Sequence, residues 1–434
     1  MTRMLPNYSL TTLPNGLRLV LSPMEGVGSV TVLAMVGVGS RYETEEQAGI
    51  AHFLEHMVFK GTANYPTAMD VSSTIDGVGG QYNAFTGKDY TGYYAKVASQ
   101  HLELAVDVIS DMLLTPRLLP EDIEREKGVI IEEMNMYEDD PRRKIDDIYD
   151  GVVYGKSDLG REIIGYKKTV RACDNLKFQD FLDSWYELRN VVVVVAGDSS
   201  VVRSQESGVG KLIEKAFSKG KSRTGKGKVK FVVPTQSSPQ LKVSYKKTEQ
   251  AHFYLGFPAL KRDDDDYFVQ LVLSNYLGGN SSARLFNEIR EKRGLAYYAY
   301  ASSESYADVG SLYAFEGVDP GRVEEAMKVT LQEFAKAKKG EMAEHEVVRT
   351  KEYLQGKLIL DWEDSQSVAL TYARKVLLSK TMETLNDMLE KVRKVELNQV
   401  KGLAGRLFDE QKLNLALIGP YRDQQKFADL LKSV

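Results

Sequence analysis

The chain has 434 residues, of which 43% are apolar and 27% charged, with a formal net charge of −4 at pH 7. This is the composition of a globular protein large enough for two or more cores, and the near balance of acids and bases gives no preference for nucleic acid or an anionic membrane. No stretch approaches the roughly 20 apolar residues of a membrane span, and the first residues lack the apolar stretch of a secretory signal, so we expect a cytoplasmic protein.

The first predicted elements are a strand at residues 16–21 and a helix with the string His52-Phe53-Leu54-Glu55-His56. Positions i and i+4 of a helix lie one turn apart on the same face, so both imidazoles can point at one ion while Glu55 borders the same site. A catalytic zinc ion takes three protein ligands and leaves a fourth position to water, so this motif is one ligand short. The alternatives are a buried polar pair and a site that has lost its metal.

Residues 79–90 begin with two glycines and continue as a strand in which polar and aromatic residues are interleaved. Such a strand is either part of an ordinary hairpin or the exposed edge of a sheet. An exposed edge offers unpaired backbone groups, to which an extended peptide can add as one more strand. The segment is therefore a candidate for binding peptide backbone.

A second helix is predicted over residues 120–135, because it opens with a proline and an acidic first turn. Glu126, Ile130 and Glu133 recur at i, i+4 and i+7 and therefore share one stripe. One of the two glutamates can bind the metal while the other supports a ligand. Glu132 lies about 100° further round the helix, away from that stripe.

The two halves of the chain resemble each other in their order of predicted elements. Each begins with a strand, at 16–21 and 240–245, and each closes with a β-branched or aliphatic run that ends in glycine, at 190–197 and 414–419. Amphipathic helices are predicted between them, for example at 320–337 and 343–358, so the expected fold class is α+β. A basic, glycine-containing stretch at 219–230 near the middle is interpreted as a solvated linker.

The second half contains a charged segment, residues 284–297, with Arg290 followed seven positions later by Tyr297. A guanidinium and a phenol are donors that can be aimed at negative charge developing on a carbonyl oxygen. On one charged helix, the same two residues would be ordinary surface groups. The residues alone leave both interpretations open.

Together, these motifs resemble the M16, or pitrilysin-like, zinc metallopeptidases, and within them the mitochondrial-processing-peptidase-like subgroup M16B. The resemblance covers the flanks of the histidine motif, Gly37-Val38-Gly39-Ser40-Arg41, Gly49-Ile50-Ala51 and Phe59-Lys60-Gly61-Thr62. It implies that His52, His56 and Glu133, which stands 77 positions after His56, bind Zn²⁺. It further implies that Glu126 supports a ligand and that Glu55 is the general base acting on water at the metal.

The resemblance also implies the domain plan. We expect two homologous α+β domains, each a mixed β-sheet covered by helices in the LuxS/MPP-like metallohydrolase fold, with a zinc-bearing domain at 1–217, a basic linker at 218–235 and a metal-free domain at 236–434. Where the second domain should repeat the metal motif, residues 271–279 contain no histidine. By the same resemblance, Arg290 and Tyr297 hold substrate and stabilise the oxyanion, and Asn83, Ala84 and Phe85 line the substrate strand.

In the family, four such domains form a closed chamber, and this chain supplies two. Because the chain has both the zinc motif and the Arg/Tyr pair, we expect a homodimer in which Arg290 and Tyr297 act on the zinc site of the partner subunit. The expected activity is a zinc endopeptidase for unstructured peptides. The alternatives are a non-catalytic partner or scaffold subunit and a specific presequence-processing protease. Residues 278–282 form only a short glycine-rich segment, which favours the general peptidase over the processing protease.

Overall fold

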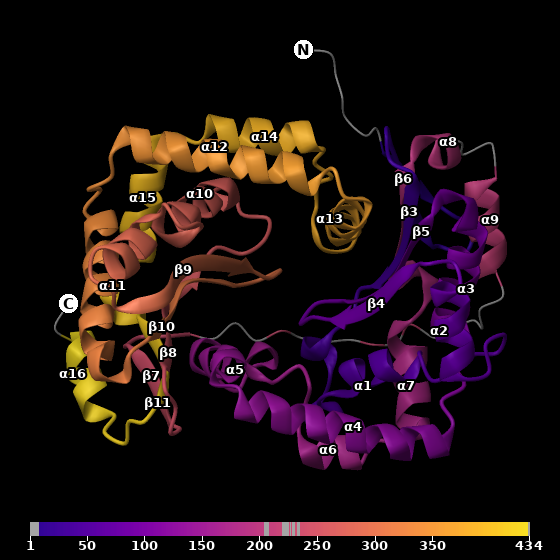
Figure 1. Ribbon diagram of the computed structural model, residues 1–434, viewed down its shortest axis with the longest axis horizontal. Coiled ribbons are helices and arrows are strands. Elements are labelled where there is room, and N and C mark those ends of the chain that lie inside the picture. Colours follow the sequence, from indigo (N-terminus) through magenta and orange to yellow (C-terminus); the bar gives the residue numbers. More distant parts are fainter. Residues whose placement is uncertain are drawn as a thin grey trace. The chain divides into compact units, whose positions relative to one another are not determined.

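A computed structural model describes residues 8–203, 208–218, 225, 227, 231 and 235–432. The chain forms two compact units, each built on one β-sheet (Figure 1). The first unit comprises Met1–Met134, Glu162–Lys230 and Ile359–Leu385, and the second comprises Asn135–Arg161, Phe231–Leu358 and Asn386–Val434. Most of the basic linker predicted at 218–235 lies outside the described residues, so its role and the contiguous domain boundaries stay predictions.

The first unit contains a six-stranded sheet in the order β1-β2-β6-β3-β5-β4. β2 and β6 are parallel, and the other neighbours are antiparallel. β4 is the last strand of the sheet and pairs with β5. The strands are β1 (Ser9–Thr12), β2 (Arg18–Met24), β3 (Ser29–Val36), β4 (Gln81–Thr86), β5 (Thr91–Ala98) and β6 (Val191–Asp198).

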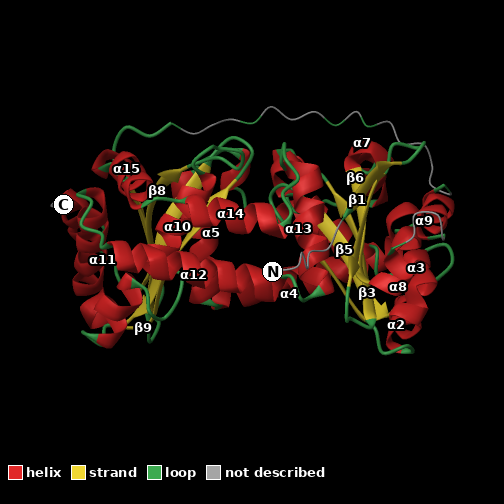
Figure 2. Ribbon diagram, turned by 90° about the horizontal axis from the view of Figure 1, so that it is seen from above, coloured by secondary structure: helices red, strands yellow, loops and turns green. Residues whose placement is uncertain are grey.

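The valine run of β6 is buried along its whole length, which indicates that both faces of this sheet are covered. Helix α3 (Leu102–Leu114) packs on β3 and β5, and α13 (Ser365–Leu378) packs on β3 and β6. Figures 1 and 2 show these two helices on opposite sides of the sheet. On the α13 side, the buried hydroxyls of Thr31 and Ser365 lie 2.8 Å apart, and Lys96 pairs with Asp364 at 2.5 Å.

The second unit contains a five-stranded sheet in the order β7-β11-β8-β10-β9. It matches the order β2-β6-β3-β5-β4 strand for strand, including the single parallel pair, here β7 with β11. This correspondence confirms the prediction of two homologous α+β domains with mixed sheets. The strands are β7 (Gln240–Tyr245), β8 (Ala251–Ala259), β9 (Ala296–Ser305), β10 (Gly310–Val318) and β11 (Asn414–Gly419).

Helices cover both faces of the second sheet as well. Because side chains alternate along a strand, Ser311 and Leu312 of β10 point to opposite faces. Ser311 meets Tyr149 of α5 (Pro141–Val153), with 2.8 Å between the two hydroxyl oxygens. Leu312 belongs to the core that the sheet forms with α10 (Tyr267–Gly278), α11 (Val323–Lys338) and α15 (Leu397–Leu407).

Helices α5 and α13 occupy equivalent places in the two halves of the chain and are exchanged between the two units. α5 follows α4 (Pro120–Asp139) in the first half but packs on β7, β8 and β11. α13 follows α12 (Glu344–Asp361) in the second half but packs on β2, β3 and β6. The compact units are therefore discontinuous in sequence.

The helices predicted at 120–135, 320–337 and 343–358 correspond to α4, α11 and α12. Within the described residues, no helix combines the length and the apolar character needed to cross a membrane. The remaining helices are α1 (Ile50–Met57), α2 (Ala68–Asp76), α6 (Lys167–Arg171), α7 (Asn175–Trp185), α8 (Ser199–Val202), α9 (Val209–Phe217), α14 (Leu385–Lys394) and α16 (Gln425–Lys432), and a π-helical turn spans Phe286–Glu291.

Candidate metal centre

Helix α1 presents the two histidines of the motif on one face. Its apolar residues, among them Phe53 and Leu54, are fully buried, and the Phe53 ring packs edge-on against Phe178 of α7 with ring centroids 5.0 Å apart. The opposite face carries His52 and His56, whose ring centroids lie 4.7 Å apart. The 3.6-residue period therefore places both imidazoles on the polar side of an anchored helix.

Helix α4 supplies the carboxylates. Glu126 and Ile130 are buried, Glu133 is half-buried and Glu132 is exposed, which is the pattern expected of a stripe at i, i+4 and i+7. One oxygen of Glu133 lies 3.7 Å from Nε2 of His52 and 3.5 Å from Nε2 of His56. The structure thus brings together the three residues predicted to bind the metal.

The donor set of His52, His56 and Glu133 fits a zinc ion. Each residue offers one ligand atom, and these three atoms lie within 4.8 Å of one another. Two imidazoles and one carboxylate are a known catalytic zinc set, which leaves one position open. Burial, together with the nearby His56, lowers the pKa of His52 to about 3, so its ring is neutral at pH 7, the form that binds a cation.

Glu126 contacts His56, the ring that it is predicted to support. One of its oxygens lies 2.9 Å from Nδ1 of His56, which leaves Nε2 of that ring to face Glu133. The other oxygen pairs with Lys60 Nζ at 2.7 Å. Burial raises the pKa of Glu126, but the bonds to His56 and Lys60 outweigh it, and the pKa ends below its usual value.

Lys60 was not singled out by the sequence reasoning, although it lies in the matched flank after the motif. It stands at i+4 from His56, just beyond the end of α1. The position of Lys60 one helical turn after His56, together with the acidic helix expected nearby, could have indicated a contact with a carboxylate. Only the tertiary fold shows that this carboxylate is Glu126.

Glu55 lies on the same helix as the two candidate histidine ligands and is bonded to the end of strand β4. The hydroxyl of Thr86 donates to Oε2 of Glu55 at 2.6 Å. Burial raises the pKa of the Glu55 carboxyl, and the Thr86 bond and nearby His56 oppose that rise. A carboxylate with raised proton affinity is better suited to accept a proton than an ordinary carboxylate is.

The three residues predicted to line the substrate strand divide between two faces of β4. Thr86 contacts Glu55, so the alternation along the strand places Ala84 on the α1 side. Asn83 and Phe85 point to the other side, where the Phe85 ring lies over Gly92 of β5, leaving no room there for a Cβ. Substrate binding by these residues stays a prediction.

Arg290 and Tyr297 lie side by side in the second unit. Arg290 is in the π-helical turn and Tyr297 is near the start of β9, so the two do not share one helix. The guanidinium carbon lies 5.1 Å from the centre of the Tyr297 ring. Tyr297 is 71% exposed, so its hydroxyl group is accessible to a ligand.

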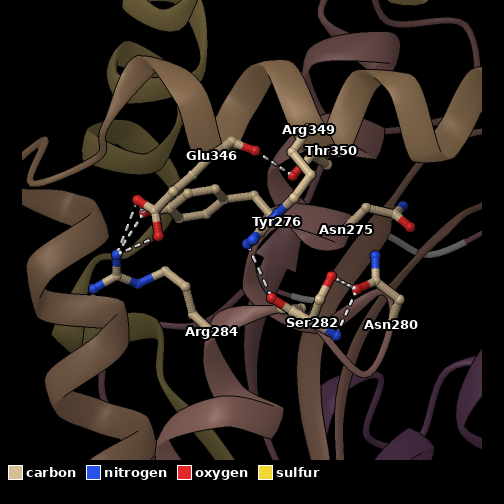
Figure 3. A pocket seen from close by; sticks show the side chains of 9 residues that line it. Asn275, Tyr276, Asn280, Ser282, Arg284, Glu346, Arg349 and Thr350 are labelled. Atoms are coloured by element: carbon tan, nitrogen blue, oxygen red, sulfur yellow. Dashed lines mark hydrogen bonds and ion pairs between the residues drawn. The ribbon is translucent and has the colours of Figure 1, made fainter.

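A small polar pocket lies next to the glycine-rich segment, also in the second unit (Figure 3). Two of its charged groups pair with each other, Arg284 with Glu346 at 3.2 Å, and Arg284 also binds Glu333 outside the pocket at 2.7 Å. Arg349 donates to the Ser282 carbonyl at 3.0 Å. The cavity volume is about 10 Å³, roughly the space that one water molecule needs. The bond from Arg349 links the glycine-rich segment to α12.

Comparisons with known proteins agree with this architecture. Residues 19–166 match the family model described as insulinase, peptidase family M16, and residues 175–354 match the model described as the peptidase M16 inactive domain. The first match contains the candidate metal centre, and the second contains Arg290 and Tyr297.

Relatives of similar length carry zinc-protease names. The chain is 36% identical to an uncharacterized zinc protease of Streptomyces coelicolor, covering 96% of this chain and 90% of the relative. It is also 36% identical to the uncharacterized zinc protease YmxG of Bacillus subtilis, covering 94% and 97%. A protease from Helicobacter pylori shares the fold, with a TM-score of 0.90 at 24% identity over 96% of this chain and all of that one.

These matches define a peptidase-type hydrolase with two domains of one family. The chain belongs to peptidase family M16.

Proposed function

We propose that the protein is a zinc-dependent endopeptidase that hydrolyses unstructured peptides. The observation that carries this proposal is the convergence of His52, His56 and Glu133, with their ligand atoms within 4.8 Å of one another and Glu126 bonded to one ring. When bound there, zinc would polarise water and the scissile carbonyl group.

Glu55 is the proposed general base. Its carboxylate would take a proton from the attacking water and pass it to the leaving amine, so one group serves both halves of the reaction. Thr86 donates to Oε2 of Glu55 at 2.6 Å, so Oε1 is the oxygen that we propose accepts the proton. His56 lowers and Glu133 raises the pKa of the Glu55 carboxyl, which supports its position near the proposed metal ligands.

Strand β4 is the proposed binding site for the peptide backbone. It is the edge strand of its sheet, and its last residue, Thr86, contacts Glu55. An extended peptide added to this edge would have its backbone held beside Glu55 by main-chain hydrogen bonds, with weak preference for side chains. This mode requires an unfolded substrate, which supports unstructured peptides as the substrate class.

Arg290 and Tyr297 are the proposed donors to the oxyanion, and they are proposed to act in a homodimer. The chain has the metal residues in one family domain and the donor pair in the other. Two copies would supply the four domains of a closed chamber, with each donor pair serving the zinc site of the partner subunit.

The direct test combines metal analysis with one substitution. Protein purified with zinc present should contain one zinc per chain, and Glu55→Gln should keep that zinc while peptide cleavage falls about 10² to 10⁴-fold. Glu132→Gln, an exposed neighbour of the ligand Glu133, is the matched control and should retain activity. Protein without zinc, or wild-type turnover by Glu55→Gln, would contradict the proposal.

The glycine-rich segment supports a general peptidase rather than a presequence-processing enzyme. It is short, and Arg349 and Tyr353 of α12 bond to the carbonyls of Ser282 and Gly279. These two bonds hold the segment against α12 rather than leaving it extended over a substrate. Cleavage of a peptide library should show weak preference on both sides of the scissile bond, and a strong requirement for basic residues would favour presequence processing instead.

A further inference from the structure

Glu43 precedes helix α1 in the sequence, and its side chain contacts the N-terminus of that helix. Its side-chain oxygens accept hydrogen bonds from the backbone N–H groups of Gly49 and Ala51, each at 2.8 Å. The residue is only 4% exposed. A carboxylate that binds two N–H groups at a helix N-terminus makes strong, charge-assisted bonds in a favourable position relative to the helix dipole.

The helix cannot obtain this cap from its own N-cap residue. Gly49 occupies that position with φ 92°, and a Cβ there would come within 2.5 Å of the Ile164 carbonyl oxygen. A residue with a capping side chain is therefore excluded, and the first-turn N–H groups need an acceptor from elsewhere. Glu43 supplies it.

Glu43 itself stands on a rigid support. It directly follows the short 3₁₀ turn Ser40–Tyr42, and the buried Arg41 of that turn pairs with Asp89 at 3.2 Å. The Arg41 backbone N–H also donates to the Lys88 carbonyl at 3.1 Å. The segment that contains Glu43 is thus bonded both to the turn between β4 and β5 and to the start of α1.

The two histidines differ in how their rings are oriented. His56 is bonded through Nδ1 to Glu126, whereas Nδ1 of His52 is buried and has no hydrogen-bond partner in the described part of the chain. Metal-binding histidines usually owe their orientation to such a partner. No such bond holds the His52 ring within the described residues, so its placement relies more on the position of its Cα and Cβ atoms, which the first turn of α1 sets and where Glu43 binds.

We propose that Glu43 is a positioning residue that holds the first turn of α1, and with it His52, in the geometry that binds zinc. This inference rests on the proposed zinc function. Glu43, which is not one of the proposed ligands, would thus help to place His52, as Glu126 does for His56.

The test measures zinc affinity by competition with a chromogenic chelator, and the thermal stability of the zinc-free proteins. Glu43→Ala should weaken zinc binding about 10 to 100-fold, the usual effect of losing a group that supports a ligand. Glu43→Gln keeps one acceptor oxygen and should fall between wild type and Glu43→Ala. If Glu43→Ala does not fold, the Glu43→Gln comparison alone decides the question.

Asp70→Ala is the matched control, because Asp70 accepts two hydrogen bonds from Thr67 at the start of α2, in the same unit but at another helix. It should leave zinc affinity unchanged. Wild-type zinc affinity in both Glu43 variants, even with lowered thermal stability, would overturn the inference and leave a purely structural role. Absence of zinc binding by the wild-type protein would instead overturn the proposed function.

Discussion

Lys60 is the outermost member of a series of contacts that ends at His56. It pairs with one oxygen of Glu126, whose other oxygen bonds to the His56 ring. Glu126 is almost fully buried, and a buried carboxylate that loses one of two partners keeps its desolvation penalty with less compensation. The position of Glu126, and through it the orientation of His56, therefore depends on a lysine that does not touch the metal position.

Replacing Lys60 by methionine should therefore weaken zinc binding at neutral pH about 10-fold or more. Lys60→Arg keeps the positive charge and should bind zinc nearly as well as wild type. Chelator competition measures both variants, and Lys127→Met on α4, whose lysine pairs with the exposed Glu124, is a control that should have no effect. Equal zinc affinity in Lys60→Met and wild type would show that Glu126 orients His56 unaided.

At the scale of single residues, the sequence indicated which side chains share a helix face better than it indicated their partners on other elements. The pairs His52/His56 and Glu126/Glu133 follow from helical spacing, because residues four or seven apart on one helix share a face whatever the rest of the fold does. The choice of Glu133 as the ligand came from the family resemblance. Lys60, Thr86 and Glu43 each act on a residue of another element or turn. Such contacts depend on tertiary packing, which local periodicity does not encode.

Among the elements, β10 contains a carboxylate in the middle of a hydrophobic core. Glu316 is 1% exposed and lies on the same face of the strand as Leu312 and Ala314. Thr330 of α11 donates to its Oε1 at 2.5 Å, whereas Oε2 has no partner within the described residues. Burial raises the pKa of Glu316 to about 8, so the folded protein keeps this group protonated at neutral pH.

This raised pKa predicts a stability that falls as pH increases. Between about pH 4.5 and 8 the unfolded chain releases the proton of Glu316 while the folded protein retains it, so the free energy of unfolding falls by up to about 1.4 kcal/mol per pH unit. Below that window both states are protonated and the contribution is constant. Glu316→Gln should remove this part of the pH dependence.

Urea unfolding of zinc-free protein at several pH values between 5 and 8 measures the effect. Glu352→Gln, an exposed position on α12, serves as the control and should keep the wild-type slope. Parallel stability curves for wild type and Glu316→Gln would mean that Glu316 is ionised in the folded protein. The sequence offered no sign of this group, because alternation marks the face of a strand but does not identify a buried acid on it.

For the molecule as a whole, the predicted plan of two homologous domains is confirmed by the matching strand orders of the two sheets. Predicted strands such as 240–245 and 414–419 coincide with β7 and β11, because β-branched and aliphatic runs bounded by turns are a local signal. No local sequence signal predicts that α5 and α13 each pack on the sheet formed by the other half of the chain. An amphipathic helix shows that it must cover a sheet, but its sequence does not say which of two equivalent sheets it covers.

The sharing of sites between subunits is the prediction at the largest scale. If Arg290 and Tyr297 serve the partner's zinc site, a dimer of one Glu55→Gln chain and one Tyr297→Phe chain contains one complete site. The intact Glu55 then comes from one chain and the intact Tyr297 from the other. Such a mixed dimer should regain about half of the wild-type activity, since closed two-fold symmetry creates two equivalent sites.

The two chains are to be co-expressed with different affinity tags and the mixed dimer purified over both. Each variant alone should be strongly impaired, Tyr297→Phe by about 10² to 10³-fold through loss of one oxyanion donor. Tyr245→Phe, another exposed tyrosine of the second unit, is the control and should leave activity unchanged. A purified mixed dimer as inactive as its parents would place each donor pair with the zinc site of its own chain, because then neither site contains both intact residues.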